Sequence, residues 1–491
     1  MMLVANKTRK GDCMMKSIVE EKLVSFKTLE QKVFAYVCEL GRMITQIILE
    51  NYDDELAKER NPKVYRDKGK RKTSIKTVYG EVEYSRRVYR TEQEDGRTAH
   101  IYLLDQAMQM EKIGLISTNL AEKIALTVTE SPYRVSADMI SDACGQTISH
   151  GGVWNLIQQL GERISEEEEH AVQQMEADQA EGKRSVGILF EEMDGVWLRM
   201  QDSSHKKAPK QEMKVFTMYE GWDADSPKRS RLVNKKMLAG MEKSDRFHQK
   251  REALIEKVYN ADEIGQRILN GDGGSWIKES YDPEVLFQLD RFHIYKEIKQ
   301  KIRDVEAQEQ IKELLEQKKV EEMLEYIQIY ADSIESDDPK DTGSKNARGL
   351  YKYLWNNREG LIPYRERGME LPDAPEGILY KNMGVQENQN CTVITMRMKH
   401  RRMRWSVQGA NNMAKALYRK ENRELIDIIE RYTDGLVFTM QIEEIVKTLS
   451  AAKAPKKDGK GNPYIEAITH HMPLLDAMRT ASRKAFARAF C

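Results

Sequence analysis

The sequence predicts a mixed α/β fold, and three observations support this prediction. First, three consecutive β-strand patterns run through residues 185–241, in SVGILFEEMDGVWLRMQ, EMKVFTMYEGW and RSRLVNKKMLAGM. Second, helix and strand patterns alternate through residues 244–296. Third, a highly charged block with helical spacing fills residues 297–370 and separates these elements from later polar motifs. Consecutive strands followed by helix–strand alternation are typical of a mixed sheet covered by helices.

The N-terminal part is predicted to be mainly helical with one β-hairpin. Apolar residues recur at helical spacing through residues 17–57, which indicates one or two helices. The segment TSIKTVYGEVEYSRRVYR then alternates apolar and polar residues, with Tyr79-Gly80 as the turn between two strands.

A helix-turn-helix pattern follows. In SADMISDACGQTISHGGVWNLIQQLGERI, a short helix over 136–143 meets a turn at Gly145, and a second helix begins near Ser149. Such a unit can place its second helix in the major groove of DNA, although short helix pairs also pack together for purely structural reasons. The polar run SEEEEHAVQQMEADQAEGKR indicates an exposed linker helix and a domain boundary near residue 180.

The length and composition of the chain exclude several classes of protein. A chain of 491 residues is long enough for about two to four domains. It contains no run of roughly eighteen apolar residues, which predicts that nothing spans a membrane. The five cysteines form no CxxC pair, which argues against a zinc ribbon and indicates a reducing, cytoplasmic setting.

Basic residues are clustered although the formal net charge is +0. The clusters lie in residues 58–90 and 397–404, and such clusters can neutralise DNA phosphates while acidic segments elsewhere balance the total. Either cluster taken alone is more often a solvated charged face. The candidate DNA-binding residues are Lys70, Arg71, Lys72, Arg86, Arg87, Arg397, Lys399, Arg401 and Arg402.

Three acids stand out by their context. Asp194 lies inside an otherwise apolar strand, where a carboxylate must be paired or bound to a cation. Asp272, in LNGDGGSWI, follows a strand and is flanked by glycines that allow a substrate or metal to approach closely. Glu387 begins the segment ENQNCTVITMRMKHR, whose spacing fits a helix with basic residues along one side. Each acid alone also fits a cap, a turn or a surface position.

If the fold brings these three carboxylates together, they could bind metal ions jointly. Carboxylate oxygens are the ligands that Mg²⁺ prefers, and a two-metal site stabilises the attacking and leaving oxygens of a phosphodiester. The sequence LDRFHIYKEI adds Asp290 and His293 at a strand-to-helix junction. Asp290 can act there as a helix cap, whereas His293 can donate to a phosphate.

Together these motifs resemble the bacterial ISLre-type insertion-sequence transposases, which are distantly similar to the Mutator-like group. The resemblance rests on MDGVWL, GDGGSWI and LDRFH, with TVYGEVEYSRRVYR near the start and MRMKHRRMRWSVQGANNMAKAL near the end. It implies that Asp194, Asp272 and Glu387 are the catalytic triad that holds Mg²⁺ or Mn²⁺, and that Asp290 and His293 fill an Asp-x-x-His motif. Because ENQN lacks the small residues expected around the third acid, Glu421 and Gln408 remain alternatives to Glu387.

The resemblance also implies an architecture and an activity. The expected fold is an RNase H-like catalytic domain with a helical insertion, preceded by a mainly helical DNA-binding region that contains the hairpin. The expected boundaries are 1–115 and 116–180 for the DNA-binding region, 181–296 and 376–425 for the catalytic core, 297–375 for the insertion and 426–491 for a C-terminal helical region. The expected activity is cutting at element ends and joining 3′-hydroxyls to target DNA.

The resemblance also implies a binding partner, and two other functions remain as alternatives. The expected partner is double-stranded DNA, bound by a homo-oligomer in the cytoplasm at the nucleoid. One alternative is a catalytically decayed transposase that acts as a DNA-binding regulator. Another is a structure-specific nuclease or resolvase with the same site, which would cut DNA without joining it.

Overall fold

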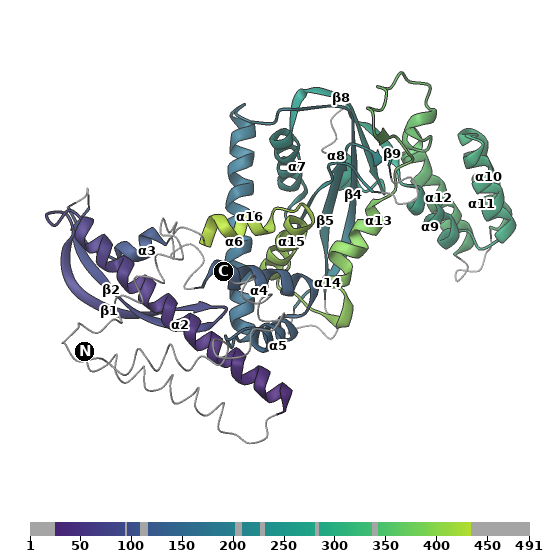
Figure 1. Cartoon of the computed structure of the whole chain (residues 1–491). Helices are drawn as coiled ribbons and strands as arrows, with labels where there is room; N and C mark the ends of the chain where they lie inside the picture. Colours follow the sequence, from purple (N-terminus) through teal and green to yellow (C-terminus); the bar gives the residue numbers. More distant parts are fainter. Residues whose placement is uncertain are drawn as a thin grey trace, which may run out of the picture. The chain divides into compact units, whose positions relative to one another are not determined.

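The chain has a mixed α/β fold, as the sequence predicts (Figure 1). The computed structural model describes residues 25–93, 96–108, 116–201, 209–225, 231–279, 284–335 and 342–433. Residues 17–24 of the first predicted helix and residues 434–491 of the predicted C-terminal helical region therefore lie outside the described residues. None of the described helices is both long and apolar enough to cross a membrane.

The predicted N-terminal helix and hairpin are both present. The elements are α2 (Phe26–Glu59), β1 (Arg66–Thr77), β2 (Gly80–Glu92), β3 (Thr98–Ile101) and α3 (Leu103–Ala107). The β1–β2 turn consists of Val78 and Tyr79, one residue earlier than predicted, because Thr77 pairs with Gly80. The third strand, β3, was not predicted, and it pairs antiparallel with β2. Leu49, Tyr52 and Leu56 of α2 pack on this sheet.

Two of the next three helices form the predicted helix pair. The elements are α4 (Thr118–Glu130), α5 (Tyr133–Ala143) and α6 (His150–Glu176). Ser149 caps α6, since its hydroxyl accepts a hydrogen bond from the Gly152 amide. The predicted helix in the acidic segment is present as the second half of α6, but its prediction as an exposed linker is wrong. It packs on two later helices, and Glu168 is only 6% exposed. Glu168 is buried because Lys250 and Lys415 neutralise it.

A five-stranded sheet forms the centre of the fold, in the order β7-β5-β4-β8-β9. The strands are β4 (Arg184–Arg199), β5 (Lys210–Tyr219), β7 (Lys236–Gly240), β8 (Tyr259–Gly271) and β9 (Leu286–Leu289). Along the chain, the first three strands of this sheet, β4, β5 and β7, pair antiparallel. β8 then pairs in parallel with β4, and β9 pairs in parallel with β8. The carboxyl ends of β4, β8 and β9 therefore lie at one edge of the sheet.

Helices cover both faces of this sheet (Figure 1). On one face, Arg251 of α7 (Ser244–Val258) contacts Met193, and α6 packs on α7 and on α15 (Val407–Glu421). Ser244 is the first residue of α7 rather than its cap, which is Lys243. On the other face, Phe190 packs against Tyr364 and Met383. The chain then forms a continuous helix on this side, made of α13 (Gln386–Gln389), the π-helical turn η3 (Asn390–Thr395) and α14 (Met396–Met398).

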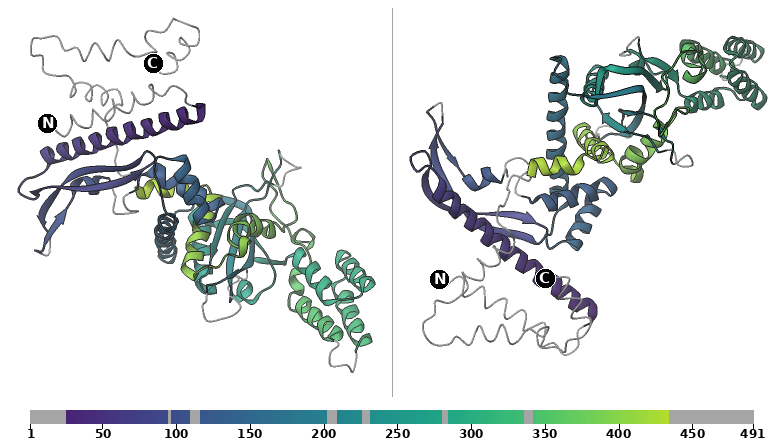
Figure 2. Two further views of the ribbon diagram at one scale, coloured as in Figure 1. Left: turned by 90° about the horizontal axis from the view of Figure 1, so that it is seen from below. Right: turned by 45° about the horizontal axis from the view of Figure 1, so that its top comes forward.

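The predicted helical block separates β9 from α13 (Figure 2). It contains α9 (Arg291–Lys301), α10 (Val305–Glu316), α11 (Val320–Ser333) and α12 (Gly343–Asn356). Ile311, Leu324 and Leu350 are among the residues that form its core, in continuity with the core of the sheet. The remaining short elements are β6 (Trp222–Asp223), α8 (Ser275–Glu279), η1 (Arg358–Gly360), η2 (Tyr364–Glu366), β10 (Ile378–Leu379), η4 (His400–Arg402) and α16 (Leu425–Thr433).

Candidate metal centre

Asp194 is a buried carboxylate on the central strand β4, with 8% of its surface exposed. Its Oδ1 accepts a hydrogen bond of 2.7 Å from the Gly195 amide, and its Oδ2 accepts one of 2.7 Å from the side-chain amide of Asn390. Burial raises the pKa of Asp194 to about 6, and the negative charges of Asp272 and Glu387 act in the same direction. The site is therefore one in which negative charge accumulates and a cation would be stabilised.

Asp272 follows directly from the end of β8. Because β8 runs parallel to β4 and Gly271 pairs with Met193, Asp272 reaches the same edge of the sheet as Asp194. Gly273 has a φ of 79°, and a Cβ atom there would lie 2.6 Å from Oδ1 of Asn357, so this position requires glycine. The Asp272 carbonyl accepts a hydrogen bond of 2.9 Å from the Tyr353 hydroxyl, which fixes this loop against α12.

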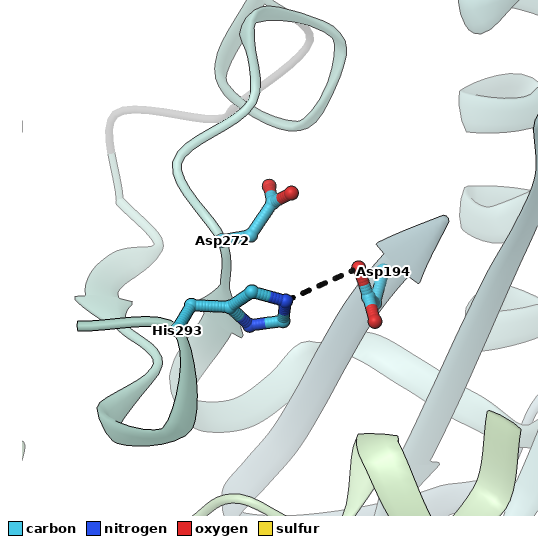
Figure 3. A group of neighbouring side chains, drawn as sticks. All are labelled: Asp194, Asp272 and His293. Carbon is cyan, nitrogen blue, oxygen red and sulfur yellow. Dashed lines mark ion pairs between the residues drawn. The ribbon is translucent and has the colours of Figure 1, made fainter. Parts of the chain in front are cut away.

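His293 lies in the first turn of α9 and points at Asp194 (Figure 3). Asp290 caps the helix through the His293 amide and also lies 3.0 Å from Nδ1 of the ring. A carboxylate only accepts hydrogen bonds, so Nδ1 carries the hydrogen and Nε2 faces Oδ1 of Asp194 at 3.9 Å. Burial alone would lower the pKa of His293, but the bond to Asp290 and the charges of Asp194 and Asp272 raise it.

Asp194, Asp272 and His293 together form a group that could hold a metal ion. One ligand atom from each lies within 4.8 Å of the other two. The two carboxylates fit Mg²⁺ or Mn²⁺, whose preferred ligands are oxygens. The bond from Nδ1 to Asp290 orients the imidazole, as carboxylates commonly do for histidines at metal centres. Fold and local geometry thus bring together three side chains that are far apart in the sequence.

Glu192 attaches helix α13 to the sheet. It is fully buried on the same face of β4 as Asp194, and it accepts hydrogen bonds from the backbone amides of Gly384, Val385 and Gln386, at 3.0, 3.1 and 3.1 Å. The Tyr219 hydroxyl donates a further bond of 2.6 Å. A carboxylate at the first turn of a helix satisfies amides that otherwise have no partner. Glu192 therefore positions the helix that carries Glu387 and Asn390.

A buried amide connects Glu192 to the histidine. Asn270 of β8 donates to Glu192 at 3.1 Å and to Oδ1 of Asp290 at 3.0 Å. The side chain of Gln288 of β9 in turn donates to the side-chain oxygen Oδ1 of Asn270 at 3.2 Å. This buried network holds Asp290, and through it His293, in a fixed orientation toward Asp194.

The predicted third acid occupies a more open position than the first two. Glu387 is exposed on α13, and its negative charge helps to raise the pKa of Asp194. The alternatives have other partners: Glu421 forms an ion pair with Lys235, and Gln408 donates to Glu162. Glu387 lies outside the group formed by Asp194, Asp272 and His293, but its negative charge contributes to the raised pKa of Asp194.

The C-terminal basic residues divide into buried and exposed ones. The prediction that Arg397 contacts DNA is wrong, because Arg397 is 5% exposed and donates to the Val128 carbonyl between the rings of Tyr133 and Trp405. Lys399, Arg401 and Arg402 are exposed. Arg401 and Arg402 have φ values of 59° and 55°, a conformation that costs free energy outside glycine.

The N-terminal basic residues divide in the same way. The prediction that Arg86 contacts DNA is wrong, because its side chain is buried in an ion pair with Asp105 and lies over the Tyr102 ring. Arg87 is held by Asp53 and Asp54 of α2, and Lys70 also pairs with Asp54. Arg71 and Lys72 on β1 are exposed. Arg86 and Arg87 therefore stabilise the contact of β2 with the neighbouring helices.

Sequence reasoning missed Glu192, Asn270 and Gln288. The available signal was the pair Glu192 and Asp194 at alternate positions of an apolar strand, which places both on one face of the sheet. Asn270 stands two residues before Asp272 on β8, within the same strand-end motif.

The chain is similar to proteins of one family over most of its length. Residues 19–428 match the family model described as "Uncharacterised protein family (UPF0236)". A UPF0236 protein of Caldanaerobacter subterraneus subsp. tengcongensis is 25% identical over 388 residues, covering 77% of this chain and 73% of the relative. Another from the same strain is 25% identical over 412 residues, covering 82% and 79%.

A relative from a different organism has the same degree of similarity. The protein named "UPF0236 protein in vanSb 3′region" of Streptococcus gallolyticus is 25% identical over 343 residues, which covers 68% of this chain and 70% of the relative. The matched residues include the sheet, the helical block and all the side chains of the candidate metal centre. The chain therefore belongs to the UPF0236 family.

Proposed function

We propose that this chain is a metal-dependent DNA transposase that cuts at the ends of an insertion sequence and joins the freed 3′-hydroxyls to target DNA. The observation that carries the proposal is the convergence of Asp194, Asp272 and His293 at the carboxyl edge of the sheet. Acids at adjacent strand ends, with a third acid on a later helix, are an arrangement suited to phosphoryl transfer.

The sheet supports an RNase H-like fold for the catalytic part. Three strands pair antiparallel, a fourth pairs in parallel with the first and a fifth pairs in parallel with the fourth. A later helix packs back on the first strand. The helical block between β9 and α13 agrees with an insertion into such a domain.

Asp194 and Asp272 would hold Mg²⁺ or Mn²⁺, with Glu387 completing the acidic ligand set. The bound cation would stabilise charge that develops on the phosphate and on the attacking and leaving oxygens. The chain's own residues supply the remainder of the site. Asn390 orients Asp194 through Oδ2, and Asp290 leaves Nε2 of His293 directed into the site. When the ring is protonated, which its raised pKa favours, Nε2 can donate to a phosphate oxygen.

An exposed basic loop supports binding of the DNA backbone beside this site. The Trp405 amide donates to the Arg199 carbonyl at the end of β4, so the residue that follows this loop lies about 17 Å along the strand from Asp194. Lys399, Arg401 and Arg402 are exposed there, and cationic side chains bind phosphates by releasing counterions. The strained backbone of Arg401 and Arg402 is typical of positions with a functional role.

The names of two relatives add support of a different kind. One Caldanaerobacter relative carries eleven locus designations of a single strain in its name, and another carries four. Many copies of one protein within a genome are what an element that copies or moves itself would produce.

The test is a strand-transfer assay with purified full-length protein, Mn²⁺ or Mg²⁺, a plasmid target and DNA carrying the two ends that flank the gene. We expect 3′-end cleavage and joining by the wild type, and loss of both by Asp194→Asn and Asp272→Asn with DNA binding retained. Asp262→Asn, an exposed acid on the same strand β8, is the matched control and should behave as wild type. Cleavage without joining would indicate a nuclease instead, and full activity of Asp194→Asn would exclude this site.

A further inference from the structure

The first half of α2 presents apolar side chains that no described residue covers. Phe26, Leu29, Val33 and Leu40 are 77%, 39%, 48% and 40% exposed. The second half of the helix packs on the hairpin through Leu49 and its neighbours, whereas the first half continues past the hairpin turn (Figures 1 and 2). Gly41 marks the last contact with that turn, since a Cβ atom there would lie 2.7 Å from the Tyr79 ring.

These four residues belong to a heptad pattern, whereas the exposed Phe34 and Val37 fall at its b and e positions. With Phe26 at position a, apolar residues fill every a and d position through residue 47, and we call this set the α2 stripe. It consists of Phe26, Leu29, Val33, Tyr36, Leu40, Met43 and Ile47. An alternating spacing of three and four residues is typical of a helix that packs lengthwise against another helix.

The heptad also separates the α2 stripe from the face that holds the hairpin. Cys38, Gly41, Leu49 and Leu56 contact the turn, the hairpin or the segment before α6, and all of them fall at positions b, c or f. Positions b, c and f lie opposite a and d on a helix. The α2 stripe therefore serves a partner on the far side of the helix from the hairpin.

We propose that the partner is the α2 stripe of a second copy of this chain, packed antiparallel. In this register Phe26 faces Met43 of the other copy, Leu29 faces its Leu40 and Val33 faces its Tyr36. Every a residue then meets a d residue over 18 residues of helix, a length of about 27 Å. The α2 stripe is complementary to itself in this arrangement, which favours a second copy over an unrelated segment.

Charge supports the antiparallel direction. Lys32 and Glu39 occupy successive g positions, and g positions approach each other in an antiparallel pair. The same register that aligns the apolar residues places Lys32 of each copy beside Glu39 of the other, so that two opposite-charge pairs flank the seam. In a parallel pair Lys32 would instead approach the apolar Val37. Glu39 is 44% exposed while paired with Arg42 of its own helix, so its carboxylate is accessible.

The proposal is tested with the full-length protein by sedimentation velocity without DNA or metal. We expect a concentration-dependent dimer, and Leu29→Glu/Val33→Glu should raise its Kd roughly 100-fold or more, because charges would enter the apolar seam. Lys27→Glu/Gln31→Glu, on an exposed face of the same two turns, is the matched control and should leave the Kd unchanged. Circular dichroism should show equal helix content in all variants.

A charge exchange tests the register. Lys32→Glu should raise the dimer Kd about tenfold, and adding Glu39→Lys should restore it, because the two pairs re-form with their signs reversed. A wild type that stays monomeric at all concentrations, or a dimer that tolerates Leu29→Glu/Val33→Glu, would overturn the proposed interface. A double exchange that fails to restore the dimer would overturn the antiparallel register. None of these outcomes depends on transposase activity.

Discussion

The side-chain amide of Asn390 donates a hydrogen bond of 2.7 Å to Oδ2 of Asp194. The side chain of Gln386, one helical turn earlier, donates to Oδ1 of Asn390 at 2.9 Å and thereby sets the orientation of the Asn390 side-chain amide. Asn390 also begins the π-helical turn η3, a local widening that is frequent at functional sites. A helix far along the chain thus positions the central carboxylate of the candidate metal centre.

Glu387 should be the third acid, and Glu421 should not. Glu387 lies on the same helix as Asn390, and its negative charge helps to raise the pKa of Asp194. Glu421 is instead paired with Lys235. We expect Glu387→Gln to lower strand transfer about 100-fold or more, while Glu421→Gln retains most of the activity. Strand-transfer rates at saturating Mn²⁺ measure both. The reverse ranking of the two variants would transfer the role to Glu421.

Glu192 should be a positioning residue that acts through α13. With glutamine in its place, an amide group that donates would face two other donors, the Gln386 backbone amide and the Asn270 side chain. We expect Glu192→Gln to lower the free energy of unfolding by about 1–3 kcal/mol and strand transfer at least tenfold. Urea denaturation and the joining assay measure the two effects, and Glu263→Gln, an exposed acid on β8, is the control. Unchanged joining by folded Glu192→Gln would show that α13 does not depend on this anchor.

His293 should act on the DNA and not only stabilise the fold. Its ring is held through Nδ1 by Asp290, and Nε2 points to Asp194. We expect His293→Ala to lose cleavage with little change in thermal stability, because the side chain lies at the rim of the sheet. In Asp290→Asn one oxygen can still accept from the His293 amide and Nδ1, but the new amide group then faces the donating amide of Asn270. The ring should therefore be held less firmly, and cleavage should fall by a smaller factor than in His293→Ala. A collapse of stability with normal cleavage by the remaining folded protein would make His293 structural.

Local patterns predicted much of the fold and part of the site. The hairpin, the strand around Asp194 and the helical block follow from alternation or helical spacing, which depend on neighbouring residues. The partners of Glu192 and Arg397 lie far away along the chain, in Gly384–Gln386 and Val128, so no local pattern reveals them. The basic neighbours of Arg397 therefore predict a contact with DNA, although its side chain reaches back into the core.

The acidic segment of α6 shows the same limit and gives the last prediction. Its pattern indicates a solvated helix, yet Glu168 is buried among Lys250, Lys415 and Tyr418, which all bond to its carboxylate. Burial alone would raise the pKa of Glu168, but the two ammonium groups outweigh it and lower the pKa to about 2. The network joins α6 to α7 and α15, and so fixes the N-terminal helices to the sheet.

This network should make the stability of the protein dependent on acid. Because the pKa of Glu168 in the folded protein lies below its ordinary value of 4.5, its stabilisation is fully present above that value and is lost as the pH falls toward 2. We expect Glu168→Gln to lower the free energy of unfolding at pH 7 by about 3 kcal/mol or more, since two buried ammonium groups lose their counter-charge. The difference from wild type should shrink as the pH is lowered from 5 toward 3. Glu166→Gln, which is 63% exposed on the same helix, should have little effect at any pH. Urea titrations across this pH range measure the difference, and a Glu168→Gln penalty that stays constant with pH would mean that packing, not charge, accounts for it.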